Sequence, residues 1–308
     1  MTEQRPDLSV RLGPLRLKNP ILSASGTFGY GEAFSALWDV SQLGGLVVKG
    51  LSLKPKAGNP PPRIVETPCG MLNAIGLANI GLDAFLKEKM PRLEHLDTAV
   101  IVNIYGHSME EYGAVASGLK GVKGIAAIEV NVSCPNVACG GMAFGTDPRI
   151  TARVTETVLK HVDKPVIVKL SPNVTDIRAM AMAAESAGAH AVSLINTLTG
   201  MAVDIRQKKP KLANTVGGLS GPAIRPVALY MVHQVVQSVR IPVIGMGGIM
   251  DYDNALEFLI TGAGAVQVGT ANFIRPHALP EIIGGLERHC RDRGIARIRD
   301  LIGTLKTR

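Results

Sequence analysis

The segments Ala187-Gly188-Ala189-His190-Ala191-Val192 and Thr261-Gly262-Ala263-Gly264-Ala265-Val266 repeat one pattern, in which a helix-ending glycine leads into an apolar strand. Glycine commonly follows a helix because it adopts the left-handed backbone conformation without strain. A second repeat is a proline-led strand start, in Lys164-Pro165-Val166-Ile167 and Arg240-Ile241-Pro242-Val243-Ile244. We therefore predict that the chain is built from repeated strand–helix units.

Eight short apolar runs occur along the chain, and segments with helix signals separate them. None of the runs alternates polar with apolar residues, which is typical of strands buried on both faces. Thr175 or Asp176 can cap one of the intervening helices, and Asp251 or Asp253 can cap another. The predicted strands are Ile21–Ala24, Leu46–Lys49, Ala99–Asn103, Ala127–Asn131, Val166–Leu170, Ala191–Ile195, Pro242–Gly245 and Ala265–Gly269.

Eight such units imply an α/β fold of the (β/α)8 type, the TIM barrel. The segment Val10–Leu17 is predicted to be an N-terminal hairpin at the bottom of the barrel. No Ser/Gly-rich or charged linker divides the chain, and 46% apolar residues can fill a sizeable core. We therefore expect a single domain over residues 1–308.

Charge and cysteine content narrow the class of protein. The net charge is +8, but the basic residues are spread and few aromatic residues accompany them, so we expect no nucleic-acid partner. No apolar run approaches the roughly 18 residues that span a bilayer, so we expect no membrane anchor. Free thiols without a signal peptide favour the cytoplasm. The cysteines, which lack zinc or iron–sulfur spacing, are Cys69, Cys134, Cys139 and Cys290.

Polar residues or glycines end every predicted strand, at the face where a barrel carries its active site. Three connections on this face, Leu51–Gly81, Ser133–Arg149 and Thr197–Pro222, are too long for simple turns and are candidate lids. The strand-end residues are Ser25, Lys49, Asn103, Asn131 with Cys134, Lys169, Asn196 with Thr197, Gly247 with Gly248, and Gly269 with Thr270.

Glycines after the last two strands indicate a phosphate site. Gly247-Gly248 and Gly269-Thr270, with Gly221 upstream, leave backbone N–H groups accessible at the usual phosphate position of the barrel. The alternative is that both are ordinary turns. Because Gly245-Met246-Gly247-Gly248 does not match the GxGxxG dinucleotide pattern, a mononucleotide such as FMN is favoured over NAD.

Lys49 and Lys169 each end an otherwise apolar strand. An unpaired buried ammonium is costly, so these lysines are expected to be paired or used in chemistry. One use is a Schiff base, as in barrel aldolases. The other, which the neighbouring asparagines favour, is charge: one lysine stabilises an electron-rich flavin and one binds a substrate carboxylate.

Cys134 lies in the segment Asn131–Val137, directly after a buried strand. A thiolate of lowered pKa in a closed, polar pocket can act as a general base. The alternative is an inert cysteine, which we expect for the other three. The asparagines that would surround an amide-like substrate such as a pyrimidine ring are Asn73, Asn103, Asn131, Asn136 and Asn196.

Eight motifs occur in order along nearly the whole chain and together resemble the dihydroorotate dehydrogenases, in particular the class 1B catalytic subunit. Tyr105, Cys69 and Cys139 depart from the family pattern. The motifs are Ala24–Gly31, Asn73–Leu77, Asn131–Val137, Lys169–Asn173, Ile195–Thr197, Gly217–Pro222, Gly245–Ile249 and Val268–Asn272.

The resemblance implies oxidation of (S)-dihydroorotate to orotate in pyrimidine biosynthesis, with Cys134 removing the C5 proton and FMN N5 accepting the C6 hydride. It also implies a homodimer within a heterotetramer, whose second subunit carries FAD and a [2Fe-2S] cluster and passes electrons to NAD+. The implied FMN-binding residues are Ser25, Lys49, Gly50, Asn103, Asn131, Lys169, Ile195, Gly221, Gly247, Gly248, Gly269 and Thr270. The implied substrate-binding residues are Lys49, Asn73, Ala74, Ile75, Gly76, Leu77, Asn131, Asn196 and Thr197.

Three alternatives remain open from the sequence. A class 1A enzyme would use fumarate as the acceptor and need no partner subunit. An FMN-dependent oxidoreductase of uracil, dihydropyrimidines or tRNA dihydrouridine would keep the fold and the active-site cysteine. A scaffold subunit would have no activity, but it would not need polar residues at its strand ends.

Overall fold

The computed structural model describes residues 5–133, 135–136 and 142–307. Eight parallel strands form a closed barrel in chain order, and the last strand pairs with the first. Each predicted strand overlaps an observed one, so the (β/α)8 prediction is confirmed. The barrel strands are β3 (Ile21–Ser23), β4 (Gly45–Val47), β7 (Ala99–Ile104), β8 (Ile125–Asn131), β11 (Val166–Lys169), β12 (Ala191–Leu194), β17 (Val243–Met246) and β18 (Ala265–Val268).

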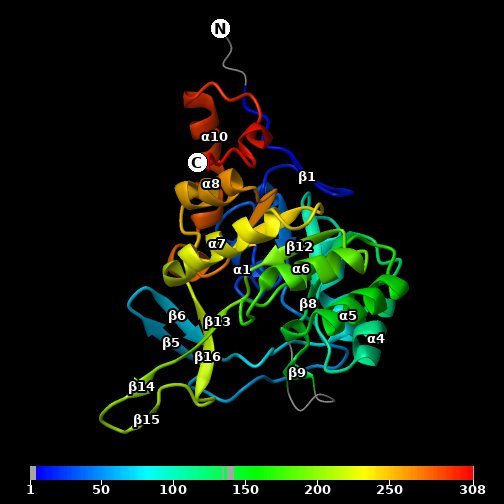
Figure 1. Ribbon diagram of the computed structural model, residues 1–308. Helices are drawn as coiled ribbons and strands as arrows, with labels where there is room; N and C mark the ends of the chain where they lie inside the picture. The colour runs from blue at the N-terminus through cyan, green and yellow to red at the C-terminus, as the bar shows by residue number, and fades with distance from the viewer. Residues whose placement is uncertain (1–4, 134, 137–141, 308) are drawn as a thin grey trace.

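Helices surround the barrel and alternate with its strands (Figure 1). The predicted caps are confirmed: the Asp176 side chain accepts from Arg178 N, and that of Asp251 accepts from Asn254 N. Within the described part of the chain, no helix is long and apolar enough to cross a membrane. The main outer helices are α4 (Met109–Leu119), α5 (Pro148–His161), α6 (Ile177–Ser186), α7 (Arg225–Val236), α8 (Tyr252–Thr261) and α10 (Ala278–Asp292).

The predicted N-terminal hairpin is present as β1 (Val10–Leu12) and β2 (Leu15–Leu17), which pair antiparallel. Leu12 and Leu17 are each 1% exposed, so the hairpin contributes its apolar face to the core. A Cβ placed on Gly264, just before β18, would lie 3.0 Å from Leu12 Cδ2. The hairpin therefore lies at the amino ends of the barrel strands, as predicted.

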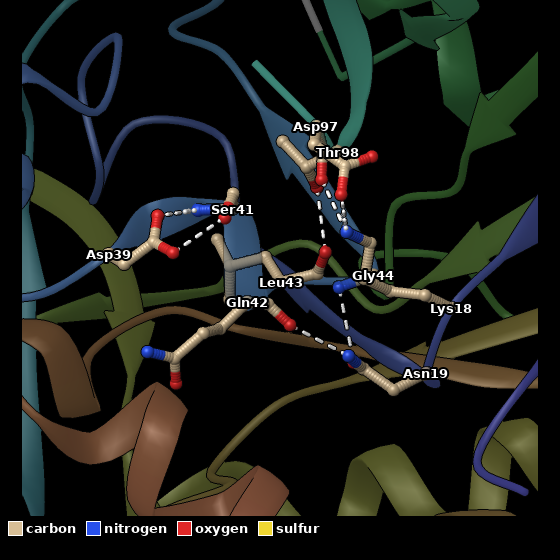
Figure 2. Close-up of polar contacts among 9 residues, drawn as sticks. All are labelled: Lys18, Asn19, Asp39, Ser41, Gln42, Leu43, Gly44, Asp97 and Thr98. Atoms are coloured by element: carbon tan, nitrogen blue, oxygen red, sulfur yellow. Dashed lines mark hydrogen bonds and ion pairs between the residues drawn. The ribbon is translucent and has the colours of Figure 1, made fainter.

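Side-chain to backbone hydrogen bonds join the first strands at this amino end (Figure 2). Asn19 Nδ2 donates to Gln42 O at 2.8 Å, and Asn19 Oδ1 accepts from Gly44 N at 3.1 Å. Gly44 has no room for a side chain, because a Cβ there would lie 1.9 Å from Asn19 O. Thr98 Oγ1 donates to Leu43 O at 2.8 Å, which ties the start of β7 to the start of β4.

Two of the three long connections contain a second sheet that the sequence did not predict. It is antiparallel, with the order β13-β16-β6-β5, and it extends from the end of the barrel opposite the hairpin (Figure 1). Its strands are short, and three of the four contain glycine, so their local pattern is that of a loop. The strands are β5 (Ile64–Thr67), β6 (Gly70–Asn73), β13 (Leu198–Met201) and β16 (Val216–Ser220), beyond which β14 (Val203–Asp204) pairs with β15 (Lys209–Pro210).

Candidate active site

A cavity of about 540 Å³ lies at the carboxyl ends of the barrel strands, beneath the second sheet. Its volume is in the range of small-molecule sites. Residues at or just beyond the ends of all eight strands line it, and so does every predicted cofactor- or substrate-binding residue. These are Ser25, Lys49, Gly50, Asn73, Ala74, Ile75, Gly76, Leu77, Asn103, Asn131, Lys169, Ile195, Asn196, Thr197, Gly221, Gly247, Gly248, Gly269 and Thr270.

One end of the cavity is formed by glycine backbone. Gly221, Gly247 and Gly248 have φ values of 96°, 129° and 70°, which favour glycine. A Cβ on Gly248 would lie 2.7 Å from Arg225 Cβ and 2.9 Å from Gly221 O. Thr270 Oγ1 donates to Ser220 Oγ at 2.9 Å and joins the end of β18 to the second sheet. This end can therefore present backbone N–H groups to an anion.

Two lysines make the cavity cationic. Lys169, at the end of β11, is 6% exposed, and Lys49 lies two residues beyond the end of β4. Burial lowers the pKa of Lys49 below its ordinary 10.5, and the positive charges of Lys169 and Arg63 lower it further. Gly26 lies beside this ammonium, since a Cβ there would be at an ordinary contact distance of 3.6 Å from Lys49 Nζ.

Asparagines on neighbouring strands form one connected group. Asn196 Nδ2 donates to Asn131 Oδ1 at 3.2 Å and to Ser133 Oγ at 2.9 Å. Thr197 N donates to Asn196 Oδ1 at 2.8 Å. Asn173, which the sequence analysis missed, donates from Nδ2 to Thr197 O at 3.0 Å. These bonds fix the amides at the carboxyl ends of β8 and β12, where they form part of one wall of the cavity.

The loop that follows β6 is held by a buried tyrosine. Tyr105 is fully buried, and its hydroxyl donates to Leu77 O at 2.9 Å and contacts Ser52 Oγ at 3.0 Å. Asn79 Nδ2 donates to the same hydroxyl at 2.7 Å. Leu77 has a φ of 61°, a conformation that is costly for a residue with a side chain. Tyr105 departs from the pattern of the family that the sequence resembles. It has a structural role here, because it supports the strained part of this loop.

Three further polar residues were missed because they lie inside the barrel strands. Glu129, Ser193 and Gln267 are completely buried, and Gln267 also lines the cavity. Each of them is a polar residue that interrupts an otherwise apolar run within its strand in the sequence. None of them is the last residue of its strand, so none is among the predicted strand-end residues.

The predicted catalytic residue, Cys134, lies outside the described residues, as does Cys139. Ser133, which directly precedes Cys134, lines the cavity. Cys290 is fully buried, and burial raises the pKa of its thiol, as expected for an inert cysteine. Cys69 is exposed.

The closed (β/α)8 barrel, with a polar, cationic cavity at its strand ends, defines the class of TIM-barrel enzymes. The dihydroorotate dehydrogenase family matches residues 7–290, and the chain belongs to this family. It is an oxidoreductase.

The curated relatives support a particular branch of the family. The chain is 57% identical over 303 residues to a protein of Geobacter sp. (strain M21), over 98% of this chain and 99% of the relative. The same identity is found over 302 residues with a protein of Geotalea daltonii, at the same coverage of both chains. Both relatives are named dihydroorotate dehydrogenase B (NAD(+)), catalytic subunit.

Proposed function

We propose that this chain oxidises (S)-dihydroorotate to orotate in pyrimidine biosynthesis, with electrons passing to NAD+. The observation that carries the proposal is that one cavity joins the glycine backbone, both lysines and the asparagine group. The names of the relatives support the type B reaction, in which NAD+ rather than fumarate is the final acceptor.

The residues present fit FMN. Gly221, Gly247, Gly248 and the Gly269-Thr270 turn suit a single phosphate, as at the phosphate site of other barrels. The buried Gln267 Oε1 lacks a hydrogen-bond partner among the described residues and is available to a cofactor N–H group. When bound, FMN supplies the hydride acceptor. Lys169, with Ser25, Gly50 and Ile195, would hold it against the strand ends.

Dihydroorotate is an anionic ring with amide groups, and the remaining cavity wall matches that chemistry. Lys49 would bind the carboxylate, while Asn131 and Asn196 would donate to or accept from the ring amides. The loop Asn73–Leu77 and Thr197 would enclose the ring. The hydrogen bond from the Tyr105 hydroxyl to Leu77 O supports this role, because it holds the loop in place.

Cys134 is proposed as the general base. Its thiolate would take the C5 proton while the C6 hydride leaves, so that one C–H bond breaks at each carbon and a C5=C6 double bond forms. Ser133 directly precedes Cys134 in the chain, and hydrogen bonds join Asn196 to Ser133 and to Asn131. The polar atoms of this group favour a thiolate. Closure of the cavity would exclude water from this step.

The word "catalytic subunit" in the relatives' names supports a second subunit. We propose that it carries FAD and a [2Fe-2S] cluster, within a heterotetramer around a homodimer of this chain. Exposed apolar side chains on the second sheet, those of Ile64 and Met201, and on the adjoining β14, that of Val203, support a subunit interface. A cytoplasmic location fits the free thiol of the exposed Cys69.

Anaerobic titration tests the proposal. The purified chain is expected to contain FMN, and L-dihydroorotate is expected to bleach the visible absorbance of the oxidised flavin. The matched control is dihydrouracil, which lacks the carboxylate that Lys49 would bind and should not bleach it. Absence of flavin, or of bleaching with dihydroorotate, would refute the proposal. Equal bleaching by both compounds would favour a uracil-type substrate.

The acceptor is tested separately. NAD+ reduction is expected only after the electron-transfer subunit is added. NAD+ requires a dinucleotide site, and Gly245-Met246-Gly247-Gly248 does not match the GxGxxG pattern that would mark one. Reduction of fumarate by the chain alone would instead indicate the class 1A reaction.

A further inference from the structure

A polar layer lies inside the barrel directly beneath the cavity. Glu129 on β8, Ser193 on β12 and Gln267 on β18 are all completely buried. These are the fourth, sixth and eighth strands, and alternate strands of such a barrel contribute side chains to one interior layer. Layers of this kind are ordinarily filled by Val, Ile and Leu, so the polar layer calls for an explanation.

The Glu129 carboxylate is the acceptor at the centre of this layer. Oε1 accepts from Ser193 Oγ at 2.8 Å and from Gln267 Nε2 at 2.5 Å, and Oε2 accepts from Asn103 Nδ2 at 2.7 Å. Three hydrogen bonds to a charged acceptor offset much of the cost of its burial. Stability alone does not require the charge, because a well-packed apolar side chain commonly serves as well.

The carboxylate determines how two amides are oriented. An ionised carboxylate only accepts hydrogen bonds, so both amides must direct their NH₂ groups toward Glu129. The oxygens, Asn103 Oδ1 and Gln267 Oε1, therefore face away from it. Asn103 and Gln267 line the cavity, whereas Glu129 and Ser193 do not. Gln267 Oε1 is buried and has no partner within the described part of the chain, although buried acceptors are nearly always paired.

We propose that Glu129 is a positioning residue for the cofactor. Through Asn103 and Gln267 it presents amide oxygens at the cavity floor as acceptors for the N–H group of the bound flavin, and it places a negative charge beneath the ring. The inference rests on the proposed FMN site, and it assigns a role to a residue that does not itself reach the cavity.

The variant Glu129→Gln tests this role in the full-length chain. Its side chain has the same shape, but it has one NH₂ group and no charge, so it cannot accept from both amides in their present orientation. The dissociation constant of FMN, measured by flavin fluorescence with apoprotein, is expected to rise about tenfold, the loss of one charged hydrogen bond. The midpoint potential is expected to rise by about 30 mV, the equivalent of a tenfold change in a two-electron couple, because removing a negative charge favours the reduced flavin.

Asn19→Ala is the matched control, because Asn19 is a buried amide at the opposite end of the same barrel (Figure 2). It should lower the melting temperature and leave both the FMN affinity and the potential unchanged. A Glu129→Gln chain with a lower melting temperature but wild-type affinity and potential would show a purely structural role and overturn the inference.

If Glu129→Gln does not fold, Ser193→Ala decides by the same measurements. It removes one donor from Oε1 and keeps the carboxylate. A rise of about threefold in the FMN dissociation constant is expected, less than for Glu129→Gln because the carboxylate and its hydrogen bonds to Asn103 and Gln267 are kept. An unchanged affinity would overturn the inference. Failure of the wild-type chain to bind FMN would instead refute the proposed function from which the inference starts.

Discussion

The two ends of the barrel are built for different purposes. At the amino end, Asn19 joins neighbouring strands, Gly44 allows close backbone contact, and the hairpin buries Leu12 and Leu17. At the carboxyl end, the same strands continue into lysines, asparagines and glycines around an open cavity. One end satisfies its polar groups internally, whereas the other leaves polar groups directed at a ligand.

The difference shows how one fold separates stability from chemistry. Residues at the amino end can be optimised for packing, because ligands bind at the other end of the strands. Charged and strained residues at the carboxyl end, such as Lys49 and Leu77, are tolerated because the rest of the barrel stabilises them. Substitutions at the two ends should therefore affect different measurements.

The largest effect is expected at the carboxyl end, from Cys134→Ala. The variant should bind FMN normally and lose about 10² to 10⁴-fold in turnover, the usual contribution of a general base. Steady-state kinetics with dihydroorotate and the flavin content of the purified protein provide the measurement. Cys69→Ala is the control, because Cys69 is exposed and should not affect the rate. A wild-type rate in Cys134→Ala would remove this residue from the mechanism.

The next largest effect is expected in the pH dependence of orotate binding, through Lys49. The pKa of Lys49 is lowered by burial and by Lys169, so the lysine is charged below that value and loses its charge as the pH rises through it. Binding of the anionic product orotate should therefore be stronger below this pKa and weaken by about 10 to 100-fold as the pH rises through it, at a pH below 10.5.

Lys49→Arg separates this effect from a general loss of structure at high pH. Arginine stays charged throughout that range, so the alkaline loss of orotate affinity should disappear in the variant. The same alkaline loss in wild type and Lys49→Arg would assign the titration to another group.

Gly44→Ala, at the amino end, should lower stability without affecting ligand binding. The new Cβ would lie 1.9 Å from Asn19 O, so the backbone must shift. The free energy of unfolding should fall by about 1–3 kcal/mol, as in other overpacked sites. Denaturant unfolding measures it, while the FMN affinity of the folded protein should remain unchanged. Reduced FMN affinity with normal stability would break the distinction between the two ends.

The smallest effect is expected from Tyr105→Phe. The variant loses the hydroxyl that donates to Leu77 O, a net change of about 0.5–1.5 kcal/mol for one hydrogen bond. The KM for dihydroorotate should rise about two- to tenfold, with little change in the flavin affinity. Tyr230→Phe on the exposed surface of α7 is the control. If both variants have the wild-type KM, Tyr105 does not support the substrate loop.

The barrel was predictable because each unit carries its own local signals. The strand Ala191–Leu194 and the caps Asp176 and Asp251 are all marked by neighbouring residues. The strand ends could also be predicted to meet, since parallel strands of a barrel share one carboxyl face. That is why the predicted cofactor and substrate residues within the described part of the chain line a single cavity.

The second sheet could not be predicted from local pattern. Its β6–β16 pairing joins Asn73 to Gly218, 145 positions apart, and neither strand has a regular apolar alternation. The polar layer was missed for another reason. Glu129 lies within a strand rather than at its end, and only the three-dimensional contact with Gln267 on another strand gives it a role.

The most direct test is a crystal structure of the chain with FMN and orotate bound. The phosphate is expected on the backbone of Gly247, Gly248 and Gly269, with the flavin above Gln267 and the orotate carboxylate at Lys49. Orotate should then lie within reach of Cys134, on the side of the Asn73–Leu77 loop. Electron density for FMN or orotate at any place other than this carboxyl-end cavity would contradict the account.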